Sequence, residues 1–285
     1  MARRNLEGLR IVITGASQGI GKALALEAAK RGMNVVAAAR SADLLYDLAS
    51  EAKPGIKGSL ATVVADVTEA SGRSAMLQCA LNNFGGVDVL VNNAGIGATG
   101  HFAEGSAETL RKIMEVNYFG LAETTRVFIS ELKKSSHAAI VNISSIAGKR
   151  GIPARSDYSA SKFAVQGFSN ALRAELAKDN IDVLVVCPGL TQTNFSKNMI
   201  EQKAKMKMDH MRGMTSEEVA VHTLRSIEIG RNEVSLTANG KLMSFVSRFF
   251  PRLADRIAKR KVIALFKEEM AERRLKRQEL KKQQV

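Results

Sequence analysis

The segment TGASQGIG, residues 14–21, lies between an apolar run and an amphipathic run of the chain. The preceding run, Arg10–Thr14, is predicted to be a strand, and the following run, Gly19–Arg31, is predicted to be a helix. Glycines in such a turn let the backbone approach a pyrophosphate, which the N–H groups and positive dipole end of the helix then bind. The segment therefore favours a dinucleotide site over the alternative, a tight turn without a ligand.

The same alternation of runs continues to about Leu236 and predicts one α/β domain. Strands alternating with helices indicate a Rossmann-like, doubly wound parallel sheet of about seven strands with helices on both faces. The apolar runs are apolar on both faces, as strands covered on both sides are expected to be. The predicted strands are Arg10–Thr14, Asn34–Ala39, Leu60–Ala65, Val87–Asn92, Ala138–Ile143, Asp182–Cys187 and Asn232–Leu236. The predicted helices are Gly19–Arg31, Ala42–Ala52, Ala70–Phe84, Thr109–Leu132, Tyr158–Lys178 and Ser216–Ile229.

Positive charge concentrates at the C-terminus. The chain of 285 residues has a formal net charge of +14, and residues 241–285 alone contain 14 Lys and Arg against 5 Asp and Glu. We therefore divide the chain into an α/β domain, residues 1–238, and a basic, amphipathic helical extension, residues 239–285. Because the basic residues are confined to the extension and aromatic residues are only 5% of the chain, we expect no nucleic-acid partner.

Composition also bears on compartment and metal binding. No run approaches the ~20 apolar residues of a spanning helix, and Arg3 and Arg4 lead into the first strand without a signal-peptide core. Two cysteines, Cys79 and Cys187, cannot form a disulfide framework. The four histidines show no metal-ligand spacing. We expect a cytoplasmic protein without a metal site.

The end of the second predicted strand indicates the type of cofactor. An NAD-binding site commonly places an Asp or Glu there, about 20 residues after the glycines, to bind the ribose 2′-hydroxyl. This chain has Ala39 followed by Arg40. A guanidinium matches a 2′-phosphate in charge and in bidentate geometry. We therefore expect NADP(H) to be preferred, with NAD(H) as the alternative.

Five further motifs follow the glycine turn in a fixed order. They are Asn92-Asn93-Ala94-Gly95, Asn117 within Glu115-Val116-Asn117-Tyr118, Ile143-Ser144-Ser145, Tyr158-Ser159-Ala160-Ser161-Lys162, and Cys187 to Thr193. Together with the turn they closely resemble the short-chain dehydrogenase/reductase family over about residues 8–236. Each motif alone is weak evidence for the family. Together, in this order and on the expected strands and helices, the motifs make the resemblance specific. It implies that residues 1–238 are an NAD(P)-binding catalytic domain.

The Tyr158 and Lys162 side chains share one helix face, because they are four residues apart. A phenol is a poor acid or base at neutral pH, and we expect the Lys162 ammonium to lower the pKa of Tyr158. Ser145, at the end of a strand, can hold a carbonyl oxygen of the substrate beside Tyr158. The family's 13-residue distance to the tyrosine selects Ser145 over Ser144. By resemblance, Asn117 completes the catalytic set and holds a water that links Lys162 to solvent.

The resemblance also implies the remaining contacts to the cofactor. Asp66, with Val67, corresponds to the acid that accepts a hydrogen bond from the adenine amine. Many NADP-using relatives carry Arg or Lys where this chain has Gln18, which leaves Arg40 and Ser17 to hold the 2′-phosphate. The expected cofactor contacts are Gly15, Ser17, Gln18, Gly19, Ile20, Gly21, Arg40, Asp66, Val67, Asn93, Ala94, Gly95, Tyr158, Lys162, Pro188, Gly189, Thr191 and Thr193.

These residues together predict an NADPH-dependent carbonyl reductase or alcohol dehydrogenase, in a homodimer or homotetramer. The alternatives are an NAD+-dependent alcohol dehydrogenase and a catalytically silent nucleotide-binding protein. The substrate loop, about residues 194–214, favours a hydrophobic, lipid-like or acyl substrate, because methionine suits varied apolar ligands. Its methionines are Met199, Met206, Met208, Met211 and Met214.

The extension alternates apolar residues such as Leu242 and Phe249 with basic residues such as Arg256. This composition is typical of a helix that lies on an anionic membrane surface. The alternative is a helix packed on its own domain or on a partner subunit. Charges at helical spacing in 267–284 indicate a solvated helix.

Overall fold

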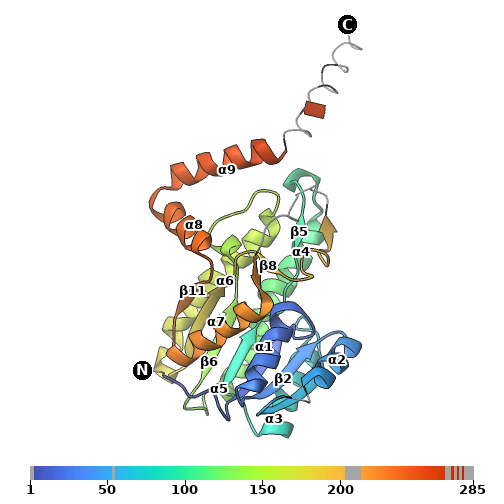
Figure 1. The fold of residues 1–285 in the computed structure, drawn as a ribbon, viewed down its shortest axis with the longest axis vertical. Coiled ribbons are helices and arrows are strands. Elements are labelled where there is room, and N and C mark those ends of the chain that lie inside the picture. The colour runs from blue at the N-terminus through green and yellow to red at the C-terminus, as the bar shows by residue number, and fades with distance from the viewer. Residues whose placement is uncertain are drawn as a thin grey trace.

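A seven-stranded parallel sheet forms the centre of the computed structural model, which describes residues 3–52, 55–202, 213–266, 271, 272, 275 and 278. The strand order is β11-β7-β6-β4-β1-β2-β3, and helices cover both faces of the sheet (Figure 1). This arrangement confirms the predicted Rossmann-like fold. The strands are β1 (Arg10–Thr14), β2 (Asn34–Ala39), β3 (Ser59–Val64), β4 (Val89–Asn92), β6 (Ala139–Ile143), β7 (Asp182–Cys187) and β11 (Glu233–Ser235).

Alternate residues of the central strands pack against two different helical layers. In β1, Ile11 and Ile13 belong to one apolar core, and Val12 belongs to the other. The first core contains residues of α1 (Gly19–Lys30), α2 (Ala42–Ala52) and α7 (Ser216–Ile229). The second contains residues of α3 (Ala70–Phe84), α5 (Gly120–Leu132) and α6 (Ser156–Glu175).

Strand β3 departs from the prediction that all strands are covered on both faces. It is an edge strand that pairs only with β2, and its side chains are half-buried or exposed, with Val64 56% exposed. At the other end of the order, β11 pairs only with β7.

The predicted single helix over Thr109–Leu132 is interrupted. The chain forms α4 (Ala107–Met114), then a π-helical turn, η2 (Glu115–Phe119), and then α5. The Asn117 side chain holds this turn through two hydrogen bonds to the backbone of Ile96, 21 residues away. Wider turns of this kind occur frequently at functional sites, and periodicity along one helix does not reveal such a distant contact.

Short elements shape the edge of the sheet where the strands end. β5 (Ala98–Thr99) pairs with β9 (Glu201–Gln202), and β8 (Thr191–Gln192) pairs with β10 (Met214–Thr215). Single turns of 3-10 helix lie at η1 (Phe102–Glu104), η3 (Ile146–Gly148) and η4 (Ala177–Asp179).

The described part of the extension forms α8 (Ala238–Phe249) and α9 (Pro251–Leu265). Pro251 at the start of α9 cannot continue the preceding helix, which ends one residue before Phe250. The solvated helix predicted for 267–284 lies almost entirely outside the described residues. Among those residues, no helix combines the length and apolar character needed to cross a bilayer.

Candidate active site

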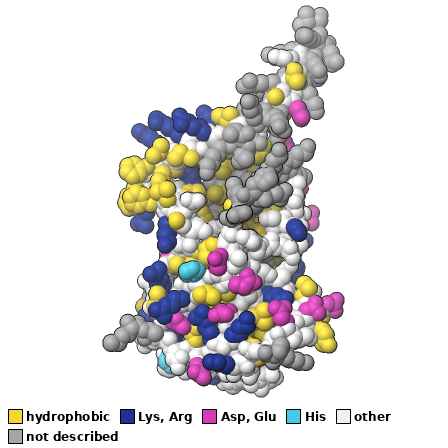
Figure 2. Space-filling model, viewed as in Figure 1, with side chains coloured by type: hydrophobic (Ala, Val, Ile, Leu, Met, Phe, Trp, Pro, Cys, Tyr) yellow, Lys and Arg dark blue, Asp and Glu magenta, His cyan; other side chains and the backbone are white. Residues whose placement is uncertain are grey.

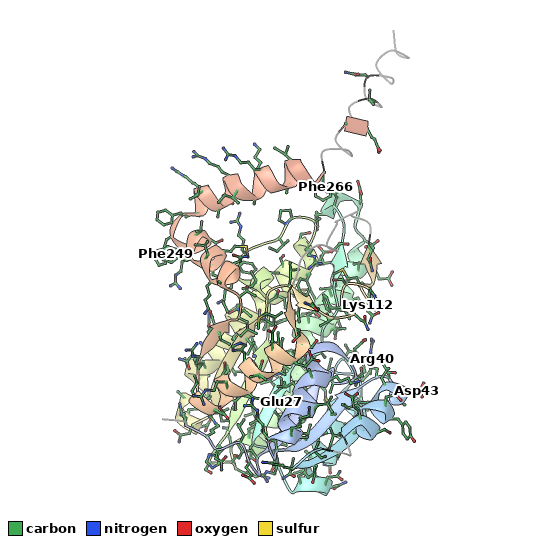
Figure 3. All side chains as sticks on the ribbon, in the orientation of Figure 1. Glu27, Arg40, Asp43, Lys112, Phe249 and Phe266 are labelled. Carbon is green, nitrogen blue, oxygen red and sulfur yellow. The ribbon has the colours of Figure 1, made fainter. Side chains whose placement is uncertain are left out.

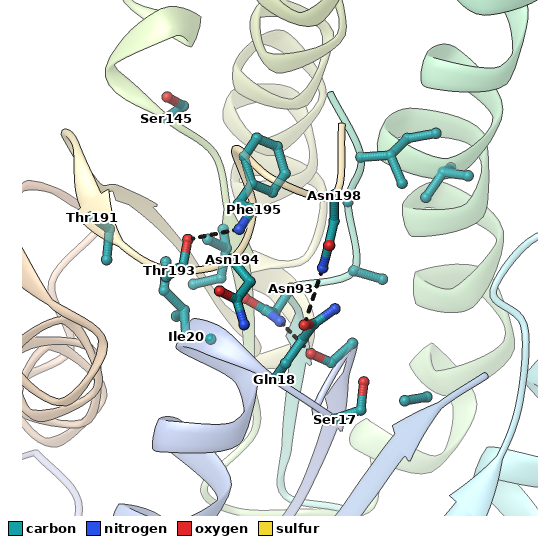
Figure 4. A pocket seen from close by; sticks show the side chains of 18 of the residues that line it. Ser17, Gln18, Ile20, Asn93, Ser145, Thr191, Thr193, Asn194, Phe195 and Asn198 are labelled. Atoms are coloured by element: carbon teal, nitrogen blue, oxygen red, sulfur yellow. Dashed lines mark hydrogen bonds between the residues drawn. The ribbon is translucent and has the colours of Figure 1, made fainter. Parts of the chain in front are cut away.

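A cleft of about 370 Å³ opens where strands β1, β4 and β6 end (Figure 4). Strand order runs outward in opposite directions from β1 and β4, and ligands of doubly wound folds bind at such a switch point. The predicted site residues that line the cleft are Gly15, Ser17, Gln18, Gly19, Ile20, Arg40, Asp66, Val67, Asn93, Ala94, Gly95, Ser145, Tyr158, Lys162, Pro188, Gly189, Thr191 and Thr193. The lining does not include Gly21 or Asn117.

The glycine turn fits a pyrophosphate. Gly15 and Gly19 have φ values of +64° and +56°, which side-chain-bearing residues rarely adopt. The cap residue of α1, Gln18, makes no side-chain hydrogen bond to the helix N-terminus. The first N–H groups of α1 therefore remain available to an anion, and the helix dipole favours negative charge there.

Gly21 lies outside the lining of the cleft and is closely packed. A Cβ atom at this position would lie 2.2 Å from the carbonyl oxygen of Gly15 and 2.5 Å from Asn93 Nδ2. Asn93 Nδ2 itself donates hydrogen bonds to the carbonyl oxygens of Thr14 and Gly15, each at 3.0 Å. Gly21 and Asn93 thus hold the turn in the shape that exposes its backbone.

Arg40 and Asp66 face each other in the lining of the cleft, with Arg40 Nη1 3.7 Å from Asp66 Oδ2. The other Asp66 oxygen accepts hydrogen bonds from the backbone and hydroxyl of Thr68. Burial raises the pKa of Asp66, but the Thr68 hydrogen bonds and the Arg40 charge outweigh it and hold this pKa below its ordinary value. Asp66 is therefore an ionised acceptor at neutral pH, and Arg40 is two-thirds exposed to a ligand.

The two adjacent serines have different environments. The Ser144 hydroxyl is buried and donates to the carbonyl oxygen of Lys162 at 3.2 Å. The Ser145 side chain lies close enough to Tyr158 to lower the pKa of its hydroxyl, and Ser145 Oγ accepts a hydrogen bond from the Ala147 N–H at 3.1 Å. Ser145 thus lies beside the tyrosine hydroxyl, where a substrate oxygen can contact both groups.

Tyr158 lies in the first turn of α6, and burial raises the pKa of its hydroxyl. The hydrogen bond with Ser145 and the positive charge of Arg155 act in the opposite direction. The prediction that Lys162 lowers this pKa is therefore wrong for this structure, because desolvation dominates and the opposing cation is Arg155. A phenol with a raised pKa stays protonated at neutral pH, so the Tyr158 hydroxyl carries a proton in this structure.

Lys162 lies one helical turn after Tyr158, with its ammonium 5.8 Å from the centre of the tyrosine ring. Its Nζ donates a hydrogen bond to the carbonyl oxygen of Ile143 at 2.9 Å. Burial lowers the pKa of Lys162 from 10.5 to about 8, partly offset by Cys187. Lys162 is therefore a desolvated ammonium that is protonated at pH 7 and loses its proton at about pH 8.

Asn117 lies behind the cleft and is fully buried. Its amide also donates to the Ser161 hydroxyl at 2.9 Å, and Ser161 donates to the carbonyl oxygen of Tyr158 at 2.8 Å. A Cβ atom on Gly95 would lie 3.2 Å from Asn117 Oδ1 and 3.6 Å from Lys162 Nζ. Asn117 therefore lies close to Lys162, while its side chain is occupied in holding η2 against α6.

Arg155 lines the cleft and was not among the predicted site residues. Burial lowers the pKa of Arg155, and Tyr158 acts in the opposite direction. The preceding residue, Ala154, has a φ of +59°, which is strained for a residue with a side chain. Arg155 and Tyr158 are three residues apart in the sequence, and this spacing could have identified Arg155 as a site residue.

Phe195 also lines the cleft and covers Tyr158, with ring centres 5.7 Å apart. Its N–H donates to the hydroxyl of Thr193 at 3.2 Å (Figure 4). In the same loop, Asn198 Nδ2 donates to Gln18 Oε1 at 3.1 Å, which joins the substrate loop to the glycine turn (Figure 4). Met206, Met208 and Met211 of the predicted methionine-rich loop lie outside the described residues.

Comparison with known proteins agrees with this geometry. The family model for short chain dehydrogenases matches residues 10–204. Mouse "Dehydrogenase/reductase SDR family member 7B" is 34% identical over 238 residues, which cover 80% of this chain and 72% of the mouse protein. "Ketoacyl reductase HetN" of Nostoc sp. strain PCC 7120 is 32% identical over 279 residues, 95% of each chain.

Solved structures show the same architecture. An alcohol dehydrogenase from Thermococcus sibiricus, complexed with 5-hydroxy-NADP, is 28% identical with a TM-score of 0.71 over 80% of this chain and 95% of that one. A short-chain dehydrogenase/reductase from Burkholderia phymatum, complexed with NAD, is 26% identical with a TM-score of 0.80. The match covers 88% of this chain and 96% of that one.

The fold and site define a dinucleotide-dependent oxidoreductase, and the chain belongs to the short-chain dehydrogenase/reductase family. It is an NAD(P)-dependent enzyme that acts on CH–OH or C=O groups. The glycine turn, Arg40, Asp66 and Lys162 form the surface that would hold the nicotinamide cofactor, which supplies or accepts a hydride when bound.

Proposed function

We propose that the enzyme is an NADP(H)-dependent carbonyl reductase that converts ketones or aldehydes to alcohols. The observation that carries the cofactor preference is Arg40, whose guanidinium lines the cleft immediately after β2, where no carboxylate ends the strand. A guanidinium binds a phosphate with charge-assisted, bidentate hydrogen bonds, whereas a 2′-hydroxyl offers it no negative charge.

The proposed reduction uses three side chains. Ser145 and Tyr158 bind the carbonyl oxygen together, and Tyr158 donates its proton as negative charge develops on that oxygen. Lys162, which lines the same cleft with its ammonium 5.8 Å from the centre of the tyrosine ring, orients the cofactor beside the carbonyl group. The reverse reaction, alcohol oxidation, uses the same groups with Tyr158 as the base.

The proposed substrate is apolar next to its carbonyl group. Ile96, Leu190 and Phe195 provide apolar lining of the cleft, and the Phe195 ring centre lies 5.7 Å from that of Tyr158. Apolar contacts of this kind favour a hydrophobic, lipid-like or acyl ketone over a small polar one. We further propose that the protein works in the cytoplasm as a homodimer or homotetramer. Sedimentation velocity tests the proposed oligomeric state.

The test combines a panel of ketones and aldehydes with both cofactors. We expect wild-type kcat/KM to be higher with NADPH than with NADH. Arg40→Asp removes the phosphate contact and adds a repulsive charge, so kcat/KM with NADPH is expected to fall by about a hundredfold. Activity with NADH is expected to be retained or increased, because a carboxylate accepts a hydrogen bond from a 2′-hydroxyl.

Arg126→Asp is the matched control, because Arg126 is exposed on α5 and, among the described residues, pairs only with Glu123. An Arg40→Asp enzyme with an unchanged preference would contradict the role of Arg40. Cofactor binding without turnover on any ketone, aldehyde or alcohol would instead support a catalytically silent binder.

A further inference from the structure

Helices α8 and α9 form a layer that is attached to the domain at several points (Figure 1). Met243 of α8 packs against Ile146 and Cys187, which lie where β6 and β7 end. Along α9, Asp255 pairs with Arg150 at 2.6 Å. Beyond its end, the buried Phe266 ring lies 4.8 Å from His101. The layer is therefore fixed over the edge of the sheet at which the cleft opens.

The outward side of this layer is apolar. Seven of the seventeen exposed large hydrophobic side chains in the described part of the chain lie within residues 242–263. Figure 2 shows them as a yellow area at one end of the molecule, and Figure 3 shows Phe249 at the outer end of α8. The seven are Leu242, Phe245, Phe249, Phe250, Leu253, Ile257 and Ile263.

Positive charges border the same side. Within residues 238–263 the only acidic residue is Asp255, which is paired with Arg150. On α9, Arg256 and Arg260 follow Leu253 and Ile257 by three residues, so cationic and apolar side chains share one side of the helix. The exposed cations of this surface are Lys241, Arg248, Arg252, Arg256, Lys259 and Arg260.

These cations form no ion pair within the part of the chain that the structure describes. Among the described residues, none of the six pairs with a carboxylate, and Arg248 instead lies 6.0 Å from the ring centre of Phe249. A second copy docked face to face would place like charges against each other, which opposes self-association. An anionic lipid surface would accept the apolar side chains and neutralise the cations together.

We propose that the exposed side of α8 and α9, the α8–α9 face, docks on the surface of an anionic lipid bilayer. The aromatic and aliphatic side chains enter the boundary between headgroups and acyl chains, and the arginines and lysines contact the phosphates. This inference is independent of the proposed reductase activity, because none of its residues belongs to the catalytic or cofactor-binding set.

The test is co-sedimentation of the full chain with vesicles of phosphatidylcholine alone or of phosphatidylcholine with about 30 mol% phosphatidylglycerol. Wild-type protein is expected to bind only the anionic vesicles, and salt is expected to weaken this binding. Arg256→Gln with Arg260→Gln is expected to weaken binding about thirtyfold. Phe245→Ser with Phe249→Ser is expected to weaken it at least about tenfold.

Point variants are preferable to truncation, because α8 also packs against the domain through Met243. The matched controls are Lys30→Gln with Lys178→Gln for charge and Tyr46→Ser for exposed apolar area, all on other elements. Thermal unfolding midpoints near the wild-type value establish that each variant is folded.

Equal binding to neutral and anionic vesicles, no binding to either, or equal losses in the control variants would overturn the proposal. A different outcome would be that wild type does not bind vesicles and that, in sedimentation velocity, the phenylalanine substitutions dissociate an oligomer. The α8–α9 face would then be a contact between copies of the chain.

Discussion

Replacing Lys162 by methionine is predicted to stabilise the fold while removing a group of the active site. Lys162 is 4% exposed, and burial lowers its pKa from 10.5 to about 8. A lowering of this size corresponds to ~3 kcal/mol of destabilisation at pH 7, where the buried amine is protonated. Methionine has a similar length and no charge, so Lys162→Met removes this cost.

The variant also loses the hydrogen bond from Lys162 to the carbonyl oxygen of Ile143. Leaving that oxygen without its donor costs ~1–2 kcal/mol. The net expectation at pH 7 is therefore a gain of ~1–2 kcal/mol in the free energy of unfolding, together with loss of turnover. The hydrogen-bond cost does not change with pH, so the pH dependence isolates the effect of the buried charge.

The sign of that dependence follows from proton binding. Between about pH 8 and pH 10.5 the unfolded chain keeps the Lys162 proton while the folded chain releases it, so wild-type stability rises with pH. From pH 7 to pH 9 the advantage of Lys162→Met is expected to shrink by ~1.3 kcal/mol. Urea unfolding of both proteins at the two pH values measures this change.

Lys178→Met is the matched control, since Lys178 is exposed in η4 and its replacement removes a charge without uncovering a buried one. An advantage of Lys162→Met that stays constant or grows between pH 7 and pH 9 would refute the argument.

Two other residues of the cleft give further predictions. Arg155→Met removes the cation that lowers the pKa of Tyr158, so the pH profile of alcohol oxidation is expected to move to higher pH, whereas a simple folding defect would lower the rate at all pH values. Phe195→Ala removes the ring that covers Tyr158, so KM for an aryl ketone is expected to rise about threefold to tenfold, with a smaller change in KM for acetone. Equal changes in KM for both ketones would exclude Phe195 from substrate selection.

Most residues predicted from the sequence lie in motifs contained within one helix or within two consecutive elements. The glycine turn is continuous with β1 and α1, and Tyr158 and Lys162 lie on one helix, so spacing was sufficient to place them. The seven strands were predicted with small errors in their bounds, because buried strands form nearly continuous apolar runs.

Contacts between distant segments explain what the sequence did not reveal. The π-helical turn depends on Asn117 reaching Ile96, and the cover over Tyr158 depends on Phe195, 37 residues later. The pKa of Tyr158 depends on burial by the complete fold, which spacing to Lys162 could not include.

The central claim is that Tyr158 is the proton donor of a nicotinamide-dependent reduction. It is tested most directly by measuring NADPH binding and single-turnover ketone reduction for wild type and Tyr158→Phe. The account predicts an NADPH Kd within about threefold of wild type and a reduction rate lowered by about a thousandfold. A Tyr158→Phe enzyme that binds NADPH and keeps more than a few per cent of the wild-type rate would contradict it.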